Sequence, residues 1–217
     1  MIRRLFSSAI LAGVLAGLVI SLLYQFTTVP LIVEAEEFET KQSADARYTT
    51  GSDNFVVHLV HNNDSKSDHP EWEPASVVER IVYTSLTTII SGVGFALLVV
   101  SALVIRGSSG GFRIGVLWGI GGFAAFILAP AAGLPPELPG MMKAELIGRQ
   151  FWWLGTAIVT ATGLWILVFY KNPYLYILAT VLLLAPHVLG APIQHSIQGS
   201  IIPAELAAKF STVSIGV

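Results

Sequence analysis

The sequence contains no cysteine and little charge. Of its 217 residues only 12% are Asp, Glu, Lys or Arg, about half of the roughly 25% found in soluble globular chains. The absence of cysteine excludes disulfides and thiolate ligands, so a metal would need imidazole, carboxylate or amide groups. With 53% hydrophobic residues and a net charge of −2, the composition predicts a membrane protein without a nucleic-acid partner.

Sequence motifs of common enzyme classes are also absent. The chain has no G-x-x-x-x-G-K-[ST] phosphate loop, no H-E-x-x-H zinc motif and no G-x-S-x-G nucleophile motif. Without an ATP site, the chain cannot power transport by hydrolysis on its own. We therefore expect a protein that is not an enzyme and carries no cofactor.

Long apolar runs separated by charged residues dominate the chain. A transmembrane helix needs about 20 predominantly apolar residues, and five runs approach that length. The sequence therefore predicts a single all-α membrane domain over residues 1–217, a polytopic helix bundle with one polar outer loop at about 34–80. The predicted spans are residues 5–26, 81–105, 114–134, 151–170 and 174–192.

The first apolar run has an alternative interpretation as a secretory signal. Two arginines precede it, and "VEA" at residues 33–35 resembles a cleavage site. However, the uncharged stretch 5–26 exceeds the roughly 7–15 residues of a signal core. Ala9, Gly13 and Gly17 also recur at every fourth position, a spacing that lets transmembrane helices pack closely. We therefore interpret this run as a transmembrane span.

Basic residues in the short loops predict the orientation, because cytoplasmic loops are enriched in Lys and Arg. Long loops count little in this rule, so the polar region 34–80 is left out, while Lys143 and Arg149 dilute the signal. If the spans alternate, the remaining basic residues fall on one side: Arg3, Arg4, Arg106, Arg113 and Lys171. We predict a multi-pass protein of the inner or plasma membrane with a cytoplasmic N-terminus.

Three predicted outward-running spans end in proline-containing segments on the outer side. Proline removes a backbone donor and disrupts a helix, and the third span breaks at Pro130, roughly 24 Å beyond Ile114. Such a segment is either a rigid exit from the membrane or a re-entrant turn that shapes an outer vestibule. The candidate path-shaping residues are Pro130, Pro135, Pro136, Pro139, Pro186 and Pro192.

The fifth predicted span contains a histidine, His187, between Pro186 and Pro192. It lies about 20 Å beyond Tyr174 on a helix, and an ionisable residue within a span indicates a functional site. The neighbouring prolines are expected to loosen the helix and free carbonyl oxygens. His187 is therefore a candidate metal ligand, followed by His195. A histidine hydrogen-bonded to a neighbouring helix is the structural alternative.

Acidic and imidazole side chains are concentrated after the first span. Together these groups favour Co, Ni, Zn or Cu(II) over Mg or Ca, and two of the histidines are three residues apart, as on one helix face. The spacing matches no closed zinc site, so an ordinary solvated loop remains the alternative. The candidate metal ligands here are Glu34, Glu36, His58, His61 and His69.

The blocks "GLPPELPG" and "PHVLGAP" resemble those of CbtA proteins, the predicted cobalt transporter subunit. The resemblance extends to "MIRRLFSSAILAGVLAGL" and "RQFWWLGTAIVTATGLWIL" and covers nearly all of the chain outside residues 40–70. It implies cobalt uptake, with Co²⁺ as the transported ion, often beside a small His-containing membrane partner, CbtB. Similar proteins continue past "PAELAAKF" into a further helix, so we expect a sixth span here to be shortened or truncated.

Two functional classes remain at this point. The first is a cation permease subunit, whose outer carboxylates and imidazoles admit Co²⁺ to a path between the first, third and fifth spans. The second is a non-transporting membrane scaffold or assembly protein, whose prolines, glycines and histidines only shape the bundle. A homo-oligomer is compatible with both.

Overall fold

The computed structural model describes residues 2–49, 76–107, 111–138, 141, 145–192 and 202–217. Every regular element in these residues is helical, which confirms the predicted all-α bundle. The elements are α1 (Ile2–Thr49), α2 (Val77–Ile105), α3 (Phe112–Phe123), the π-helical turn η1 (Ala124–Leu128), α4 (Ala129–Gly133), α5 (Leu146–Phe169), α6 (Pro173–Leu189) and α7 (Ala204–Gly216).

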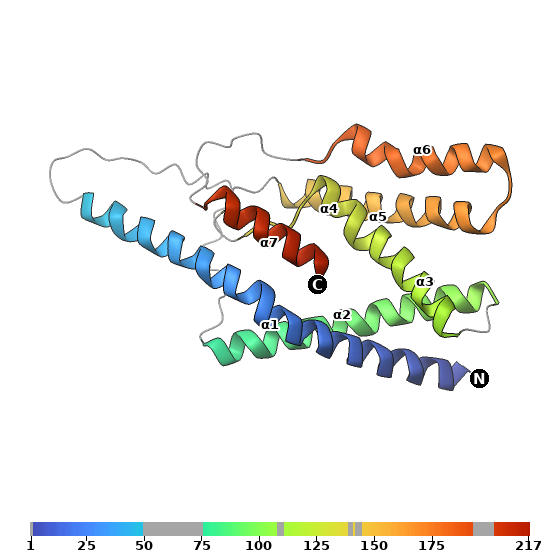
Figure 1. Ribbon diagram of the computed structural model, residues 1–217, viewed down its shortest axis with the longest axis horizontal. Helices are drawn as coiled ribbons and strands as arrows, with labels where there is room; N and C mark the ends of the chain where they lie inside the picture. The colour runs from blue at the N-terminus through green and yellow to red at the C-terminus, as the bar shows by residue number, and fades with distance from the viewer. Residues whose placement is uncertain (1, 50–75, 108–110, 139–140, 142–144, 193–201) are drawn as a thin grey trace.

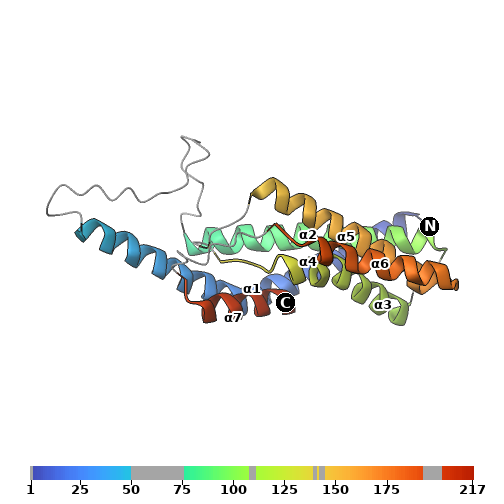
Figure 2. The ribbon, with the colours of Figure 1, turned by 90° about the horizontal axis from the view of Figure 1, so that it is seen from above.

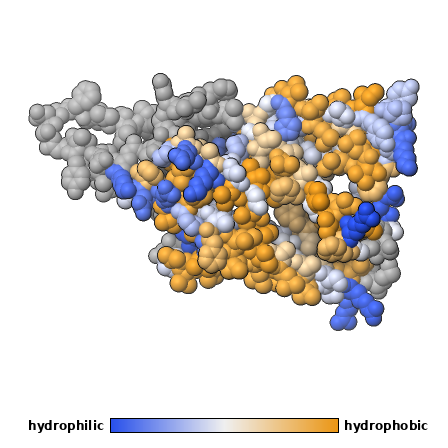
Figure 3. All heavy atoms as spheres, in the orientation of Figure 1, coloured by the Kyte–Doolittle hydropathy of each residue, from blue (hydrophilic) through white to orange (hydrophobic). Residues whose placement is uncertain are grey.

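Four of these helices are long and apolar enough to cross a membrane. They comprise Arg3–Phe38 within α1, Val77–Ile105, Phe112–Gly133 and Leu146–Phe169, and α6 is a shorter apolar helix. The 17 residues of α6 reach about 25 Å at 1.5 Å per residue. All five overlap predicted spans. Figure 3 shows apolar side chains over much of the described surface and hydrophilic ones at its right-hand end.

The helices form two antiparallel pairs with α3 crossing between them (Figure 1). One pair is α1 with α2, and the other is α5 with α6. The N-terminus, the α2–α3 connection and the α5–α6 turn lie at the right-hand end in Figures 1 and 2. We call this the basic end. The region where α4 and α6 end and α5 begins is called the proline end.

Small residues bring α1 and α2 into backbone contact. Gly13 and Gly17 are buried, and a Cβ atom on Gly17 would lie 2.5 Å from the Cα atom of Ile89. A Cβ atom on Gly13 would overlap the Cα atom of Val93, and one on Gly92 would lie 2.5 Å from the carbonyl oxygen of Gly13. The small-residue spacing seen in the sequence therefore marks a helix–helix contact, as predicted.

Helix α1 continues far beyond its predicted span. It passes Pro30 and ends at Thr49, although the polar loop was predicted to begin near residue 34. Pro30 lacks an N–H group and so leaves the carbonyl of Phe26 without its helical donor, but the following Glu and Ala residues favour helix. The acidic row is therefore helical rather than part of an irregular loop.

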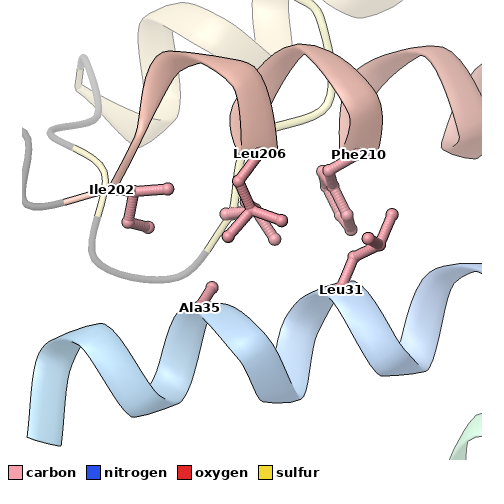
Figure 4. Packing of buried hydrophobic residues seen from close by; sticks show 6 residues of the cluster. Leu31, Ala35, Ile202, Leu206 and Phe210 are labelled. Carbon is pink, nitrogen blue, oxygen red and sulfur yellow. The ribbon is translucent and has the colours of Figure 1, made fainter.

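Helix α7 packs beside the C-terminal half of α1 (Figure 4). A cluster of buried apolar side chains joins the two helices and includes Leu138, which belongs to the segment after α4. Leu138 and Ala35 are both 0% exposed. The cluster consists of Leu31, Ala35, Leu138, Ile202, Leu206 and Phe210.

The predicted helix break at Pro130 is wrong. Helix α3 runs through η1 into α4, which ends at Gly133, close to the predicted end of the span. In η1 the Ala129 N–H group donates to the carbonyl of Ala124, the wider spacing of a π turn. This turn directly precedes Pro130, whose ring and missing N–H group do not fit the regular α-helical pattern. The chain therefore accommodates the proline without ending the helix.

Candidate cation entrance at the proline end

The two proline-containing blocks meet on the first turns of α5. A Cβ atom on Gly133, at the end of α4, would overlap the indole ring of Trp152 and lie 3.2 Å from the Cβ atom of Ala191. A Cβ atom on Gly148 would lie 3.9 Å from Pro192. The absence of a side chain at Gly133 thus allows α4, α5 and the end of α6 to converge.

An ion pair fixes the segment after α4 to α5. The Nη2 atom of Arg149 lies 2.9 Å from the Oε2 atom of Glu137, and the two side chains are 21% and 18% exposed. Charges this shielded are unfavourable without a partner, so the pair holds the chain here while its neighbour Leu138 packs against α1 and α7. From the sequence, Arg149 was predicted only to be a loop charge. The available signal was a pair of opposite charges, one on each side of a short connection.

His187 lies on α6 beside the indole ring of Trp152. The ring centroids are 6.2 Å apart with an interplanar angle of 72°, and the His187 side chain is exposed. Pro186 lies within the helix, which continues to Leu189 and stops before Gly190, with φ of 80°. Pro186 still leaves the carbonyl of Leu182 without a backbone donor. An imidazole and a free carbonyl thus occur on the last turns of α6.

A row of unpaired polar atoms runs inward along one face of α5. Trp152, Thr156 and Thr160 follow one another at helical spacing, and the two threonines are 1% and 4% exposed. The Nε1 atom of Trp152 and both threonine hydroxyls are buried without a hydrogen-bond partner among the described residues. Such groups are usually paired. This row was not predicted from the sequence, although the spacing of the two threonines within an apolar span is a signal of it.

The same face of α5 leads to the α5–α6 contact. Gly163 is buried, and a Cβ atom there would lie 3.2 Å from the carbonyl oxygen of Ala179 and 3.1 Å from the Cγ atom of Leu183. The unpaired polar row therefore lies on the face that α5 turns toward α6.

The predicted path-shaping prolines have different environments. Pro130 and Pro186 are buried, Pro136 and Pro192 are half-buried, and Pro135 is exposed. Pro139 lies outside the described residues. The buried pair is in the helices, whereas the more accessible prolines are in the connecting segments.

The predicted acidic ligands lie on α1 rather than beside His187. The Glu36 carboxylate accepts two hydrogen bonds from the Arg80 guanidinium, at 2.7 and 3.2 Å, whereas Glu34 is exposed. No group of three or more His, Asp or Glu side chains within the described ranges is arranged to hold a metal ion. His58, His61, His69 and His195 fall outside those ranges.

Comparison with protein families gives a match that covers residues 2–217. The matching family is described as "probable cobalt transporter subunit (CbtA)". No curated protein matches the chain, and no solved structure does. The match covers essentially the whole chain, including both proline blocks and the helices that bring them together. The chain therefore belongs to the CbtA family of probable cobalt transporter subunits.

Proposed function

We propose that this membrane subunit admits Co²⁺ at the proline end, with His187 as the first protein ligand. The observation that carries the proposal is the meeting of two proline blocks on the first turns of α5, beside an exposed imidazole. Imidazole nitrogen suits borderline cations such as Co²⁺, and Pro186, within α6, leaves the carbonyl oxygen of Leu182 without a backbone donor. Co²⁺ is the transported ion in this proposal, and no resident cofactor is required.

The polar row on α5 supports a route inward from this entrance. An ion that leaves water needs polar groups to replace part of its hydration. The hydroxyls of Thr156 and Thr160 are buried and unpaired among the described residues, so they are available to an ion or to its water molecules. Trp152 lies between these hydroxyls and the charged pair at the start of α5.

The proposed orientation places the proline end outside the cell and the N-terminus in the cytoplasm of the inner or plasma membrane. Its support is the basic end, where the connections that contain Arg106, Arg113 and Lys171 lie with the N-terminus (Figure 1). Cytoplasmic loops carry such an excess of basic residues. A green fluorescent protein fused to the N-terminus should fluoresce, whereas export of the N-terminus would leave it dark and reverse the orientation.

Two further elements of the proposal lie outside the described site. The outer polar region, with His58, His61 and His69, would collect the cation before Glu34 and Glu36 at the end of the first span. The family description calls the protein a subunit, which implies a partner component. We propose a small His-containing membrane protein like CbtB in that role.

The test is initial radiocobalt uptake in cells that lack other cobalt transporters, with the partner co-expressed. His187→Gln replaces the imidazole with a weaker amide ligand of similar polarity. We expect uptake at least about tenfold lower, as is typical when a metal site loses a supporting group. Thr180→Val is the matched control. Thr180 is exposed on the same helix, and its hydroxyl donates a hydrogen bond to the carbonyl of Tyr176 one turn earlier. Uptake should be normal in this control at equal membrane abundance.

Two observations favour the scaffold alternative. Glu36 already has a bidentate partner in Arg80, and His187 already packs against an aromatic ring, so both can act as structural residues. Wild-type uptake by His187→Gln at equal abundance, together with loss of uptake when the whole chain is deleted, would support the scaffold and reject the proposed entrance.

A further inference from the structure

We propose that the cavity between α2, α3 and α5 near the basic end binds an anionic phospholipid, with an acyl chain inside and the headgroup on Arg106. The cavity measures about 760 Å³, within the roughly 300–1,000 Å³ of small-molecule sites. Its walls are almost entirely apolar, and Arg106 is the one charged residue among them. Representative lining residues are Leu98, Ala102, Leu117, Phe126 and Leu164.

The apolar walls and the membrane surroundings favour an acyl chain as the occupant. From Arg106 to Leu98 the cavity follows α2 for about 12 Å at the helical rise, so it reaches well into the apolar part of the helix. Walls that face empty space lose dispersion contacts. Because lipid tails are as apolar as leucine, the surrounding bilayer supplies molecules that restore these contacts.

Aromatic side chains place the mouth of the cavity at headgroup depth. Trp118, Trp165 and Phe169 form a cluster with ring centroids 4.8 to 6.0 Å apart. Trp165 and Phe169 lie on the last turns of α5, and Trp118 lies six residues after Phe112, the first residue of α3. Tryptophan is enriched at membrane–water interfaces, so this rim is where a lipid headgroup would lie.

Arg106 gives the mouth a charge that no side chain in the described ranges neutralises. Its guanidinium lies over the Phe169 ring, 4.6 Å from the centroid, and it makes no ion pair with a carboxylate in the described part of the chain. No Asp or Glu occurs in residues 1–33, 80–136 or 146–204, which include every helix segment at the basic end. Basic pockets between transmembrane helices select anionic headgroups, and guanidinium binds phosphate in a bidentate manner.

The structure also provides a way to fill the cavity. Gly122 lines it, and a Cβ atom there would meet no described atom within 4 Å, so Gly122→Leu places a side chain where the acyl chain is proposed to lie. Gly119 is a matched control. It lies on the same helix with equally open surroundings, but it does not line the cavity.

The experiment is native mass spectrometry of the full-length protein after reconstitution in an equal mixture of phosphatidylglycerol and phosphatidylcholine. We expect wild type and Gly119→Leu to retain phosphatidylglycerol preferentially, and Gly122→Leu to lose the bound lipid. Arg106→Gln should keep a bound lipid but lower the preference for phosphatidylglycerol about fivefold, the factor expected for one basic side chain at an anionic surface. Thermal unfolding of each variant checks that it is folded.

Several outcomes would overturn the proposal. Equal phosphatidylglycerol retention by wild type and folded Gly122→Leu would show that the lipid binds elsewhere. Equal headgroup preference in wild type and Arg106→Gln would remove the assigned headgroup site. A small protein subunit retained from native membranes by wild type and lost in Gly122→Leu would identify a partner helix as the occupant instead. None of these readouts depends on cobalt uptake.

Discussion

The two faces of α2 pack in opposite ways. On one face Gly92 lies against Gly13 and Gly17 of α1, so closely that the helix backbones touch. On the other face Leu98 and Ala102 border a cavity of about 760 Å³ shared with α3 and α5. Both faces are apolar, so apolarity does not distinguish them. In a membrane, helices associate through shape fit rather than through the hydrophobic effect.

Side-chain size explains the difference between these contacts. The α1–α2 contact is built from residues with little or no side chain, which let the backbones approach. The cavity is bordered by Trp118, Phe126 and Trp165, whose rings contact one another or neighbouring rings. Large rings that pack against each other keep their helices apart. The bundle is therefore tight between α1 and α2 and open between α2, α3 and α5.

The largest effect is expected from a methyl group placed in the tight contact. In Gly13→Ala the new Cβ atom would overlap the Val93 Cα atom and lie 2.7 Å from the Gly92 carbonyl oxygen. Both are backbone atoms that cannot rotate away. We therefore expect the free energy of unfolding to fall by about 3 kcal/mol, the upper range for overpacking. Equilibrium unfolding in mixed detergent micelles measures it.

Gly94→Ala is the control, because a Cβ atom at Gly94 meets no described atom within 4 Å. There the higher helix propensity of alanine should leave stability equal or raise it by up to about 1 kcal/mol. Equal losses in the two variants would contradict the backbone contact and, with it, the contrast between the two faces of α2.

An intermediate loss of stability is expected from breaking the ion pair that joins the segment after α4 to α5 at the proline end. Glu137→Gln leaves Arg149 without its partner at 21% exposure. We expect the free energy of unfolding to fall by about 2 kcal/mol, less than the roughly 3–5 kcal/mol lost when one partner of a fully buried pair is removed. A double-mutant cycle with Arg149→Gln measures the coupling between the two residues by the same unfolding assay.

The exposed pair of Glu37 and Lys41, one helical turn apart at 65% and 71% exposure, provides the comparison. Glu37→Gln should lower the free energy of unfolding by less than about 0.5 kcal/mol. A coupling between Glu137 and Arg149 no larger than that between Glu37 and Lys41 would show that the pair does not hold the proline segment to α5.

The smallest loss of stability is expected from removing the hydrogen bond between two serine hydroxyls that joins α1 and α2. The Ser21 and Ser85 hydroxyls are 2.7 Å apart and bond to each other. Interhelical bonds of this kind contribute about 0.6 kcal/mol on average, so Ser21→Ala should cost far less than Gly13→Ala. Ser101→Ala is the control, since Ser101 is exposed and bonds only to the Leu97 carbonyl. A loss from Ser21→Ala as large as that from Gly13→Ala would mean that hydrogen bonding, not backbone approach, dominates the contact.

The sequence by itself determined the transmembrane helices and the close-packing face of the first one. A span is recognisable because every residue on it must tolerate hydrocarbon, which leaves a long apolar run. The spacing of Ala9, Gly13 and Gly17 was visible because small residues one turn apart share a helix face. The proline blocks were identified in the same local way, and their family resemblance agrees with the match over residues 2–217.

Only the tertiary structure decided what these segments contact. The partner of Glu36 is Arg80, 44 positions away, and Trp152 meets both Gly133 and His187. Spacing along one helix cannot predict such contacts, because they depend on how separate helices are positioned. The helical end of α1 beyond Glu34 and the π turn before Pro130 were missed for a related reason. Local charge and proline chemistry favoured breaks there, whereas α7 packs on the extended α1, and the wider hydrogen-bond spacing of η1 accommodates the proline.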